Sequence, residues 1–331
     1  MRYESSTTSV SWIPSEAIPG MMRLPFDLGP VHYDDPPSDQ LTDIEALSRS
    51  GAVRFINELR AWVEVENGWI VRHGHSGRGW IGKTKLGFGS RKILYPAIGM
   101  RDIRSEPESS KLSVRFVQTS GGRVAMPLPR KLNRPPFVQI VPPLVWTTLA
   151  LTINADGTSK PEVIGASPFP RHWIYDDSGR LANKVAITDF KSWSGDIFGE
   201  RTPWGAEDSP AFVTEVETAL ERELSQTIMR GGAKPKTRTL KAGEALVEQG
   251  ESGDELFLLL DGVLAVDVDG KSLAEVGPGA ILGERALLEG GKRTATLRAI
   301  TPARVAVANA DQISPEALAE LSTGHRREEK H

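Results

Sequence analysis

The residues best suited to chemistry lie in one stretch, Gly283-Glu-Arg-Ala-Leu-Leu-Glu-Gly-Gly-Lys-Arg-Thr-Ala-Thr296. Glu284 and Arg293 are nine residues apart, with a helix-forming Ala-Leu-Leu run between them. A guanidinium is a planar fork that matches two oxygens of a phosphodiester, and a carboxylate is a strong acceptor for a sugar hydroxyl. Backbone amides at the start of a short helix would add anion binding, and Gly283 would let the backbone approach the sugar closely. The stretch therefore predicts a site for one small anionic sugar phosphate.

The elements that must position this stretch are short strands. Residues 236–314 contain Leu/Val/Ala runs, each closed by a glycine-containing turn. That spacing is typical of a small antiparallel barrel or jelly roll. Asp269-Gly270, between Val266 and Leu273, marks a hairpin within it.

Residues Leu240 to about Val307 resemble the cyclic-nucleotide-binding family shared by the catabolite activator protein, protein kinase A regulatory subunits and nucleotide-gated channels. The resemblance rests on Gly243, the run Gln249-Gly-Glu-Ser-Gly-Asp-Glu-Leu-Phe257, Asp261-Gly262 and the stretch after Gly283. It implies that Glu284 binds the ribose and Arg293 the phosphate of cyclic AMP or cyclic GMP. It also implies that the pocket is completed by Gly283, Ala286, Thr294 and Ala295. The alternative is a domain that keeps the fold but has lost its ligand, with Arg293 paired to an internal carboxylate.

Two departures from the family pattern bear on the site. Arg285 stands where an apolar residue is common; it either adds positive charge to the pocket or, as we favour, is solvated. Ser314-Pro315-Glu316 begins a helix, but Ser322-Thr323-Gly324 predicts that it ends after about two turns, followed by a charged tail. The sequence therefore leaves the base open, since the Thr294 hydroxyl suits guanine and adenine alike.

Residues 1–235 are predicted to form a β-rich α+β domain. Asn67-Gly68 joins two strand-like runs, Ala61–Glu66 and Trp69–Arg72, and supplies the positive φ angles of a tight turn. Further strands are predicted at 92–98, 113–119, 123–128, 137–141 and 145–154, with a weaker helix at 41–50.

A long amphipathic helix is predicted from Ser209 to about Met229, where Ser209 caps it and Pro210 takes its first position. Apolar residues recur along it at three- and four-residue steps. The Arg-Gly-Gly-Ala-Lys-Pro-Lys segment after Met229 reads as a linker, so the domain boundary is expected near residue 235. We expect the first domain's sheet to wrap around this helix.

Other motifs in the first domain favour structural roles. Gly77 to Thr84 satisfies the P-loop formula, but the residues after Thr84 predict strand rather than the required helix. His73 and His75 could share one face of a strand, yet no third metal ligand is spaced to accompany them. A third ligand could still converge on them in three dimensions from His32, Asp34, Asp35 or His172. Asp34-Asp35 and Asp176-Asp177 resemble turn chemistry, in which carboxylates accept local backbone hydrogen bonds.

Composition narrows the class of protein. The 331 residues carry a net charge of −3 and no cysteine, which gives no general attraction to nucleic acid and no thiolate or disulfide chemistry. The N-terminus lacks the apolar core of a secretory signal, and we expect no membrane span and a cytoplasmic protein. About twenty residues follow Asp311, too few for a helix-turn-helix, so DNA binding is not expected.

The sequence therefore favours a cyclic-mononucleotide sensor in which the C-terminal domain regulates the first domain allosterically. No nucleophile–base pair stands out, so we name no catalytic residue, metal or further cofactor. Two alternatives stay open: a cyclic-nucleotide-regulated enzyme with its active site in the first domain, and an assembly protein whose C-terminal domain is structural. A protein partner or a homodimer also stays open.

Overall fold

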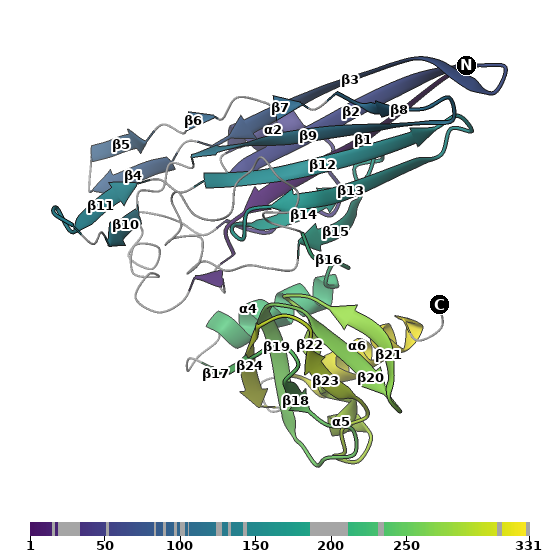
Figure 1. Cartoon of the computed structure of the whole chain (residues 1–331). Coiled ribbons are helices and arrows are strands. Elements are labelled where there is room, and N and C mark those ends of the chain that lie inside the picture. The colour runs from purple at the N-terminus through teal and green to yellow at the C-terminus, as the bar shows by residue number, and fades with distance from the viewer. Residues whose placement is uncertain are drawn as a thin grey trace. The chain divides into compact units, whose positions relative to one another are not determined.

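The computed structural model describes residues 1–14, 17–18, 34–50, 53–82, 84–88, 91–95, 98–99, 103–104, 106–123, 128–131, 134–141, 144–185, 211–230, 235–309 and 313–328. The chain divides into two compact units (Figure 1). The N-terminal unit includes Met1–Val185 and ends at Val213, and the C-terminal unit continues from Thr214. None of the helices in the described ranges is long and apolar enough to cross a membrane.

The N-terminal unit is a sandwich of two antiparallel sheets. One sheet has the strand order β16 (Val213–Thr214), β15 (Leu181–Val185), β14 (Arg171–Tyr175), β1 (Arg2–Trp12), β2 (Phe55–Glu66) and β3 (Trp69–Ile81). The other has β13 (Ser159–Ala166), β12 (Leu144–Asn154) and β9 (Ser113–Arg123), with β6 (Ile98–Gly99), β7 (Ile103–Arg104) and β8 (Glu108–Ser109) along the free edge of β9. The remaining elements are α2 (Ile44–Ser50) and the pairs β4–β5 (Thr84–Phe88, Arg91–Tyr95) and β10–β11 (Leu128–Lys131, Val138–Val141).

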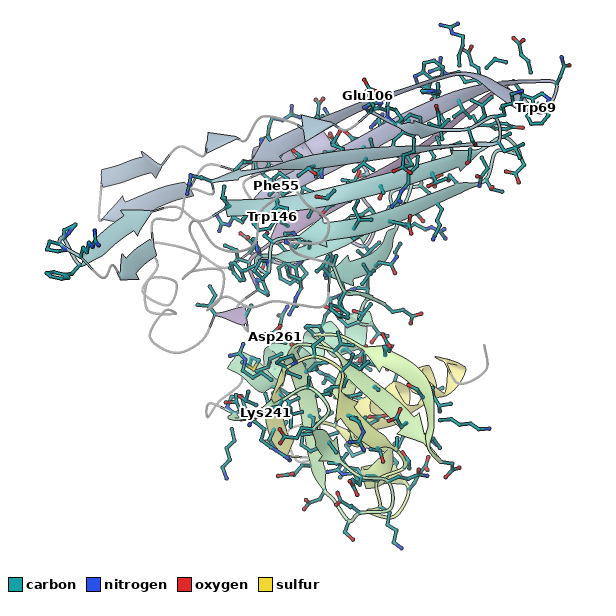
Figure 2. All side chains as sticks on the ribbon, in the orientation of Figure 1. Phe55, Trp69, Glu106, Trp146, Lys241 and Asp261 are labelled. Atoms are coloured by element: carbon teal, nitrogen blue, oxygen red, sulfur yellow. The ribbon has the colours of Figure 1, made fainter. Side chains whose placement is uncertain are left out.

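The predicted hairpin at Asn67-Gly68 is confirmed. Asn67 and Gly68 have φ angles of 51° and 79°, and they join β2 to β3 in the long antiparallel ladder visible in Figure 1. Both angles lie in the left-handed region that a type I′ turn requires. Trp69 lies at this hairpin end and is 48% exposed, whereas Phe55 and Trp146 are buried within the sandwich (Figure 2).

The interior of the sandwich changes character along its strands. One part is apolar and contains Leu59, Val63, Phe116 and Leu151. A second part is polar, because Asn57 donates to Thr147 and Gln118 donates to Asn57, with N···O distances of 3.0 and 2.6 Å. All of these side chains are buried, so the polar part is held by hydrogen bonds between the two sheets.

Two expectations for the first domain are wrong. Its core lies between two sheets rather than between a sheet and the long helix. The structure divides after Val213, so the helix that the sequence assigned to the first domain belongs to the C-terminal unit instead. The amphipathic pattern correctly predicted a helix, but periodicity does not indicate against which unit the apolar face of that helix packs.

The C-terminal unit contains two four-stranded antiparallel sheets. One has the order β17 (Lys236–Leu240), β24 (Ala303–Asn309), β19 (Glu255–Asp261) and β22 (Ile281–Leu282). The other has β18 (Ala245–Val247), β23 (Thr296–Ala299), β20 (Leu264–Val268) and β21 (Lys271–Val276). The expectation was a small barrel or a jelly roll. Neither sheet closes on itself in the described part of the chain, so the barrel is not formed there and the two-sheet jelly-roll arrangement is the one that fits. The predicted hairpin at Asp269-Gly270 is confirmed, with φ angles of 51° and 77°.

Both faces of strand β19 are buried, which accounts for the uninterrupted apolar run Leu256-Phe-Leu-Leu-Leu260. Phe257 and Leu259 face a core between the two sheets, while Leu256, Leu258 and Leu260 belong to a second core that includes residues of two helices. Because successive side chains of a strand point to opposite faces, burial of both faces requires an uninterrupted apolar run.

The first of these helices, α4 (Ala219–Arg230), begins ten residues later than predicted. Ser209 and Pro210 lie outside the described residues, and Val213 is in strand β16. The helix begins at a capping box, in which the Glu221 amide donates to Thr218 Oγ1 at 3.2 Å and the Thr218 amide donates to Glu221 Oε2 at 2.8 Å. Leu224 and Ile228 then pack into the core behind β19.

The last helix, α6 (Pro315–Glu328), is longer than predicted. Ser314 caps it, with the Ala317 amide 3.2 Å from Ser314 Oγ, as its sequence indicates. The expected stop at Ser322-Thr323-Gly324 is wrong, because burial of Leu318 and Leu321 in the core favours continuation of the helix. The Thr323 hydroxyl donates to the Ala319 carbonyl instead of ending the helix.

Candidate functional site

Arg293 is held by backbone pairing between two loops of the C-terminal unit. Its amide donates to the Glu251 carbonyl and its carbonyl accepts from the Gly250 amide, both at 2.8 Å. The Gly253 amide donates to the Gly291 carbonyl at 3.0 Å, which extends the pairing on the other side. The backbone of residues 250–253 thus fixes the position from which the Arg293 side chain projects.

The guanidinium of Arg293 is directed inward, and the residue is 5% exposed. Nη1 donates to the Glu255 carbonyl at 2.9 Å, and Cζ lies 5.1 Å from the centre of the Phe257 ring. Nε is buried and has no hydrogen-bond partner among the described residues. Two backbone positions without side chains, Gly253 and Gly283, border the guanidinium, since a Cβ atom on either would collide with it.

This environment leaves the Arg293 charge incompletely compensated. Burial lowers the pKa of the guanidinium, although the nearby carboxylates of Glu255, Asp254 and Glu251 act in the opposite direction. The group stays protonated, because arginine does not lose its proton in proteins. In the part of the chain that the structure describes, no carboxylate lies within ion-pair distance of it. An internal ion pair, the alternative to ligand binding, is therefore absent from these residues.

Glu284 lies at the start of the short helix α5 (Glu284–Leu288) and is 3% exposed. Gly283 precedes it with φ 95° and ψ 0°, a left-handed conformation that glycine adopts without strain. A Cβ at Gly283 would lie 2.7 Å from Arg293 Nη1, so the guanidinium rests against the backbone that leads into Glu284. The structure thus brings the predicted cation to the start of the helix that carries the predicted carboxylate.

The remaining predicted site residues differ in their surroundings. Ala286 is buried, and Thr294 and Ala295 are half-buried just before β23. Arg285 forms an ion pair with Glu289 at 3.4 Å along the helix, so it has a local partner rather than being simply solvated. The pair removes the need for Arg285 to enter the site.

Three residues around Arg293 were not singled out from the sequence as site residues. Gly253, Glu255 and Phe257 all fall within the run that carried the family resemblance. Their proximity to Arg293 depends on pairing between segments about forty residues apart, which no local pattern encodes.

The described residues of the N-terminal motifs favour structural roles. Gly77 and Gly79 lie within strand β3, and Thr84 begins strand β4, so the P-loop formula is not accompanied by its helix. His73 and His75 stack beside Phe116, with ring centroids 5.9 and 5.4 Å away. Over the ranges given above, no group of three or more potential metal ligands converges.

The two aspartate pairs have different roles. Asp176 accepts from the Ser178 and Arg180 amides at 3.0 and 2.9 Å, which confirms the predicted turn. Asp34 is instead buried in an ion pair with Arg54 at 2.9 Å and accepts from the Ile13 amide. The turn interpretation of Asp34 is therefore wrong, and its carboxylate joins segments about twenty residues apart.

Comparisons with known proteins find one family and several relatives. The sequence model of the family "Cyclic nucleotide-binding domain" matches residues 237–315. A cyclic nucleotide-gated potassium channel of Mesorhizobium japonicum is 41% identical over 66 residues, which are 20% of this chain and 18% of the channel. A cGMP-dependent protein kinase of Caenorhabditis briggsae is 38% identical over 61 residues, 18% of this chain and 8% of the kinase.

A crystal structure of a cyclic nucleotide-binding domain from Methylobacillus flagellatus is 29% identical and covers 28% of this chain and 62% of that one, with a TM-score of 0.26. The chain spans less than a fifth of the length of the two curated relatives named above. The residues that the family model matches lie in the C-terminal unit, and residues 237–315 of this chain are a member of the cyclic nucleotide-binding domain family.

Proposed function

We propose that the C-terminal unit binds a cyclic mononucleotide, with Arg293 on the cyclic phosphate and Glu284 on the ribose 2′-hydroxyl. The observation that carries the proposal is the buried Arg293 guanidinium, whose Nε has no partner in the described ranges and which no carboxylate neutralises there. A buried cation of this kind is costly unless an anion completes it. A cyclic phosphate supplies one charge and two oxygens in the plane of the guanidinium.

The glycines beside Arg293 support the same proposal. Gly253 and Gly283 remove the side chains that would otherwise fill the space around the guanidinium. Gly283, Ala286, Thr294 and Ala295 present small groups to the ligand, as the family resemblance implies. Arg285 stays outside, in its ion pair with Glu289. The ligands we propose are cyclic AMP and cyclic GMP.

The direct test is thermal unfolding of the whole chain with saturating cyclic AMP, GMP, CMP or UMP. A ligand that binds only the folded state stabilises it by about 2.7 kcal/mol at a hundred times its dissociation constant. We expect this stabilisation with cyclic AMP or cyclic GMP. Absence of any shift with all four nucleotides would refute the proposal.

Variants locate the site. Arg293→Lys keeps the charge but loses the two-pronged geometry, and Glu284→Gln loses the charged acceptor. We expect each to weaken binding by about 10- to 100-fold, the equivalent of one charged hydrogen bond. Arg238→Ala is the matched control, because Arg238 is an exposed arginine on strand β17 of the same unit. Equal affinity of Arg293→Lys and Arg238→Ala would place the ligand elsewhere.

We further propose that ligand binding regulates the N-terminal unit through helix α4. The helix follows directly after the segment that leaves the N-terminal unit, and its apolar face packs behind strand β19 of the C-terminal unit. A ligand with different affinities for two arrangements of this helix would shift their populations. Hydrogen exchange with and without ligand tests this, and unchanged protection over residues 213–228 would contradict it.

A further inference from the structure

The segment that leads into helix α4 lies against the turn that leads into the candidate site. Thr214 packs onto Gly277, where an added Cβ would lie 3.1 Å from Thr214 Cβ and closer still to its hydroxyl. Glu217 packs onto Gly279 in the same way, with its carboxyl carbon 2.8 Å from the added Cβ. Both glycines therefore permit a close approach that any other residue would prevent.

Glu221 joins the two segments by hydrogen bonds. One carboxylate oxygen, Oε2, accepts from the Thr218 amide at 2.8 Å and from the Thr218 hydroxyl at 3.1 Å, which completes the helix cap. The other oxygen, Oε1, accepts from the backbone amide of Ile281 at 3.1 Å. Glu221 is 4% exposed, so these bonds form away from water.

Ile281 is two residues before Gly283, in the two-residue strand β22. The backbone from Ile281 to Gly283 carries no other element, so a displacement of the Ile281 amide is transmitted to the residue against which Arg293 rests. One side chain thus fixes both the first turn of α4 and the entry to α5.

We infer that Glu221 is a positioning residue for the nucleotide site and couples that site to the start of helix α4. This inference rests on the proposed function. The bond from Ile281 holds Gly283 and Glu284 in the arrangement that accepts the ligand, and loss of the bond lowers ligand affinity without removing any group that touches the ligand. By linkage, the bound ligand stabilises the bond between Glu221 and the Ile281 amide to the same extent as that bond favours the ligand.

The experiment compares three variants of the full chain. Glu221→Ala removes the carboxylate, and with it the two cap bonds from Thr218 and the bond from the Ile281 amide, but keeps the bond from the residue 221 amide to Thr218 Oγ1. Thr218→Ala removes the cap hydroxyl but leaves Glu221 to bind the Ile281 amide, and Glu223→Ala is the control on an exposed position of the same helix. Affinities for cyclic AMP and cyclic GMP are measured by titration calorimetry, and amide exchange of residues 219–224 and 281–284 is followed with and without nucleotide.

We expect Glu221→Ala to bind about tenfold more weakly than the wild type, and Thr218→Ala and Glu223→Ala to bind within about twofold of it. Nucleotide should slow exchange of the Ile281 amide in the wild type and in Thr218→Ala, but not in Glu221→Ala. A purely structural role of Glu221 would instead make Thr218→Ala and Glu221→Ala alike in affinity, which would overturn the inference.

A second variant keeps the test decisive if Glu221→Ala does not fold. Gly277→Ala introduces a methyl group against Thr214 and leaves Glu221, Glu284 and Arg293 intact. We expect the same direction of change in affinity, and unchanged affinity overturns the inference. A wild-type chain that binds neither nucleotide refutes the proposed function itself, whereas a wild type that binds normally beside a Glu221→Ala variant of equal affinity refutes only the role of Glu221.

Discussion

Replacement of Gly283 by alanine separates backbone strain from damage to the site, because the chain offers a matched position. Gly283 and Gly290 have nearly the same positive φ angles, 95° and 94°. A Cβ at Gly283 would lie 2.7 Å from Arg293 Nη1 and 2.9 Å from the Glu255 carbonyl oxygen, whereas a Cβ at Gly290 would meet nothing within 4 Å. Both substitutions therefore place a side chain in a left-handed conformation, but only Gly283→Ala also creates a collision with the Arg293 guanidinium.

The shared penalty is the left-handed conformation of a residue with a side chain, which costs about 1–2 kcal/mol. Both variants should lose about this much of their free energy of unfolding. In Gly283→Ala the guanidinium must also move, since 2.7 Å is shorter than any ordinary contact of a Cβ atom. Loss of one charge-assisted hydrogen bond to the phosphate corresponds to about 1.5–3 kcal/mol, or roughly 10- to 100-fold in affinity.

The assay pairs urea unfolding with titration of cyclic AMP and cyclic GMP. We expect Gly290→Ala to lose stability and keep its affinity, and Gly283→Ala to lose both. Gly253→Ala provides a third comparison, because its Cβ would also meet the Arg293 guanidinium but its φ is not positive. It should lose affinity with less loss of stability. If Gly283→Ala and Gly290→Ala bind equally well, the placement of Arg293 at the ligand is refuted.

Three further predictions concern the N-terminal unit. His172 is fully buried, and desolvation lowers its pKa to about 4, so the stability it confers is present above pH 6.5 and is lost as the pH falls toward 4. The full loss of unfolding free energy between these two pH values is about 3 kcal/mol. In His172→Gln the free energy of urea unfolding should therefore fall less between pH 7 and pH 5 than in the wild type, and an equal fall would contradict this. Phe116→Ala should cost about 3–5 kcal/mol by opening a cavity in the apolar core, measured by the same unfolding, and a loss below 1 kcal/mol would show that the core rearranges. Asn57→Ala leaves the buried Gln118 amide without one acceptor and should cost about 1–3 kcal/mol, whereas an unchanged midpoint would mean that water replaces the lost group.

Features encoded by neighbouring residues were predictable from the sequence. The hairpins at Asn67-Gly68 and Asp269-Gly270 depend on two positive φ angles that these residue types supply locally. The cap of α6 at Ser314 belongs to the same class. In each case the signal and the structure that it specifies lie within a few residues.

Features decided by distant packing were not predictable in the same way. The helix was expected to begin at Ser209-Pro210, but the Thr218–Glu221 capping box lies where the buried face of α4 begins. The end of α6 was misplaced because burial of Leu321 outweighs the weak helix preference of the residues that follow it. The pairing of β1 with β14 joins residues more than 150 positions apart, and no periodicity reveals such a partner.

The sequence predicted only the part of the site that is encoded locally. The types and spacing of Glu284 and Arg293 suggested their roles, and both are buried at one end of α5. The contribution of Gly253 could not be read from the sequence, because it depends on the pairing of residues 250–253 with residues 291–293. The double hydrogen bonding of Glu221 likewise joins positions sixty residues apart.

The amides between the two sheets of the N-terminal unit have a consequence for how those sheets can stack. Contacts among aliphatic side chains have no preferred direction, so an apolar interface specifies the alignment of two sheets less strictly than hydrogen bonds do. The bonds from Gln118 to Asn57 and from Asn57 to Thr147 form in only one alignment of the two sheets. A shift of one sheet by one residue would leave these buried polar groups without partners. These three side chains thus select a unique stacking of the sandwich, a task that hydrophobic burial alone does not perform.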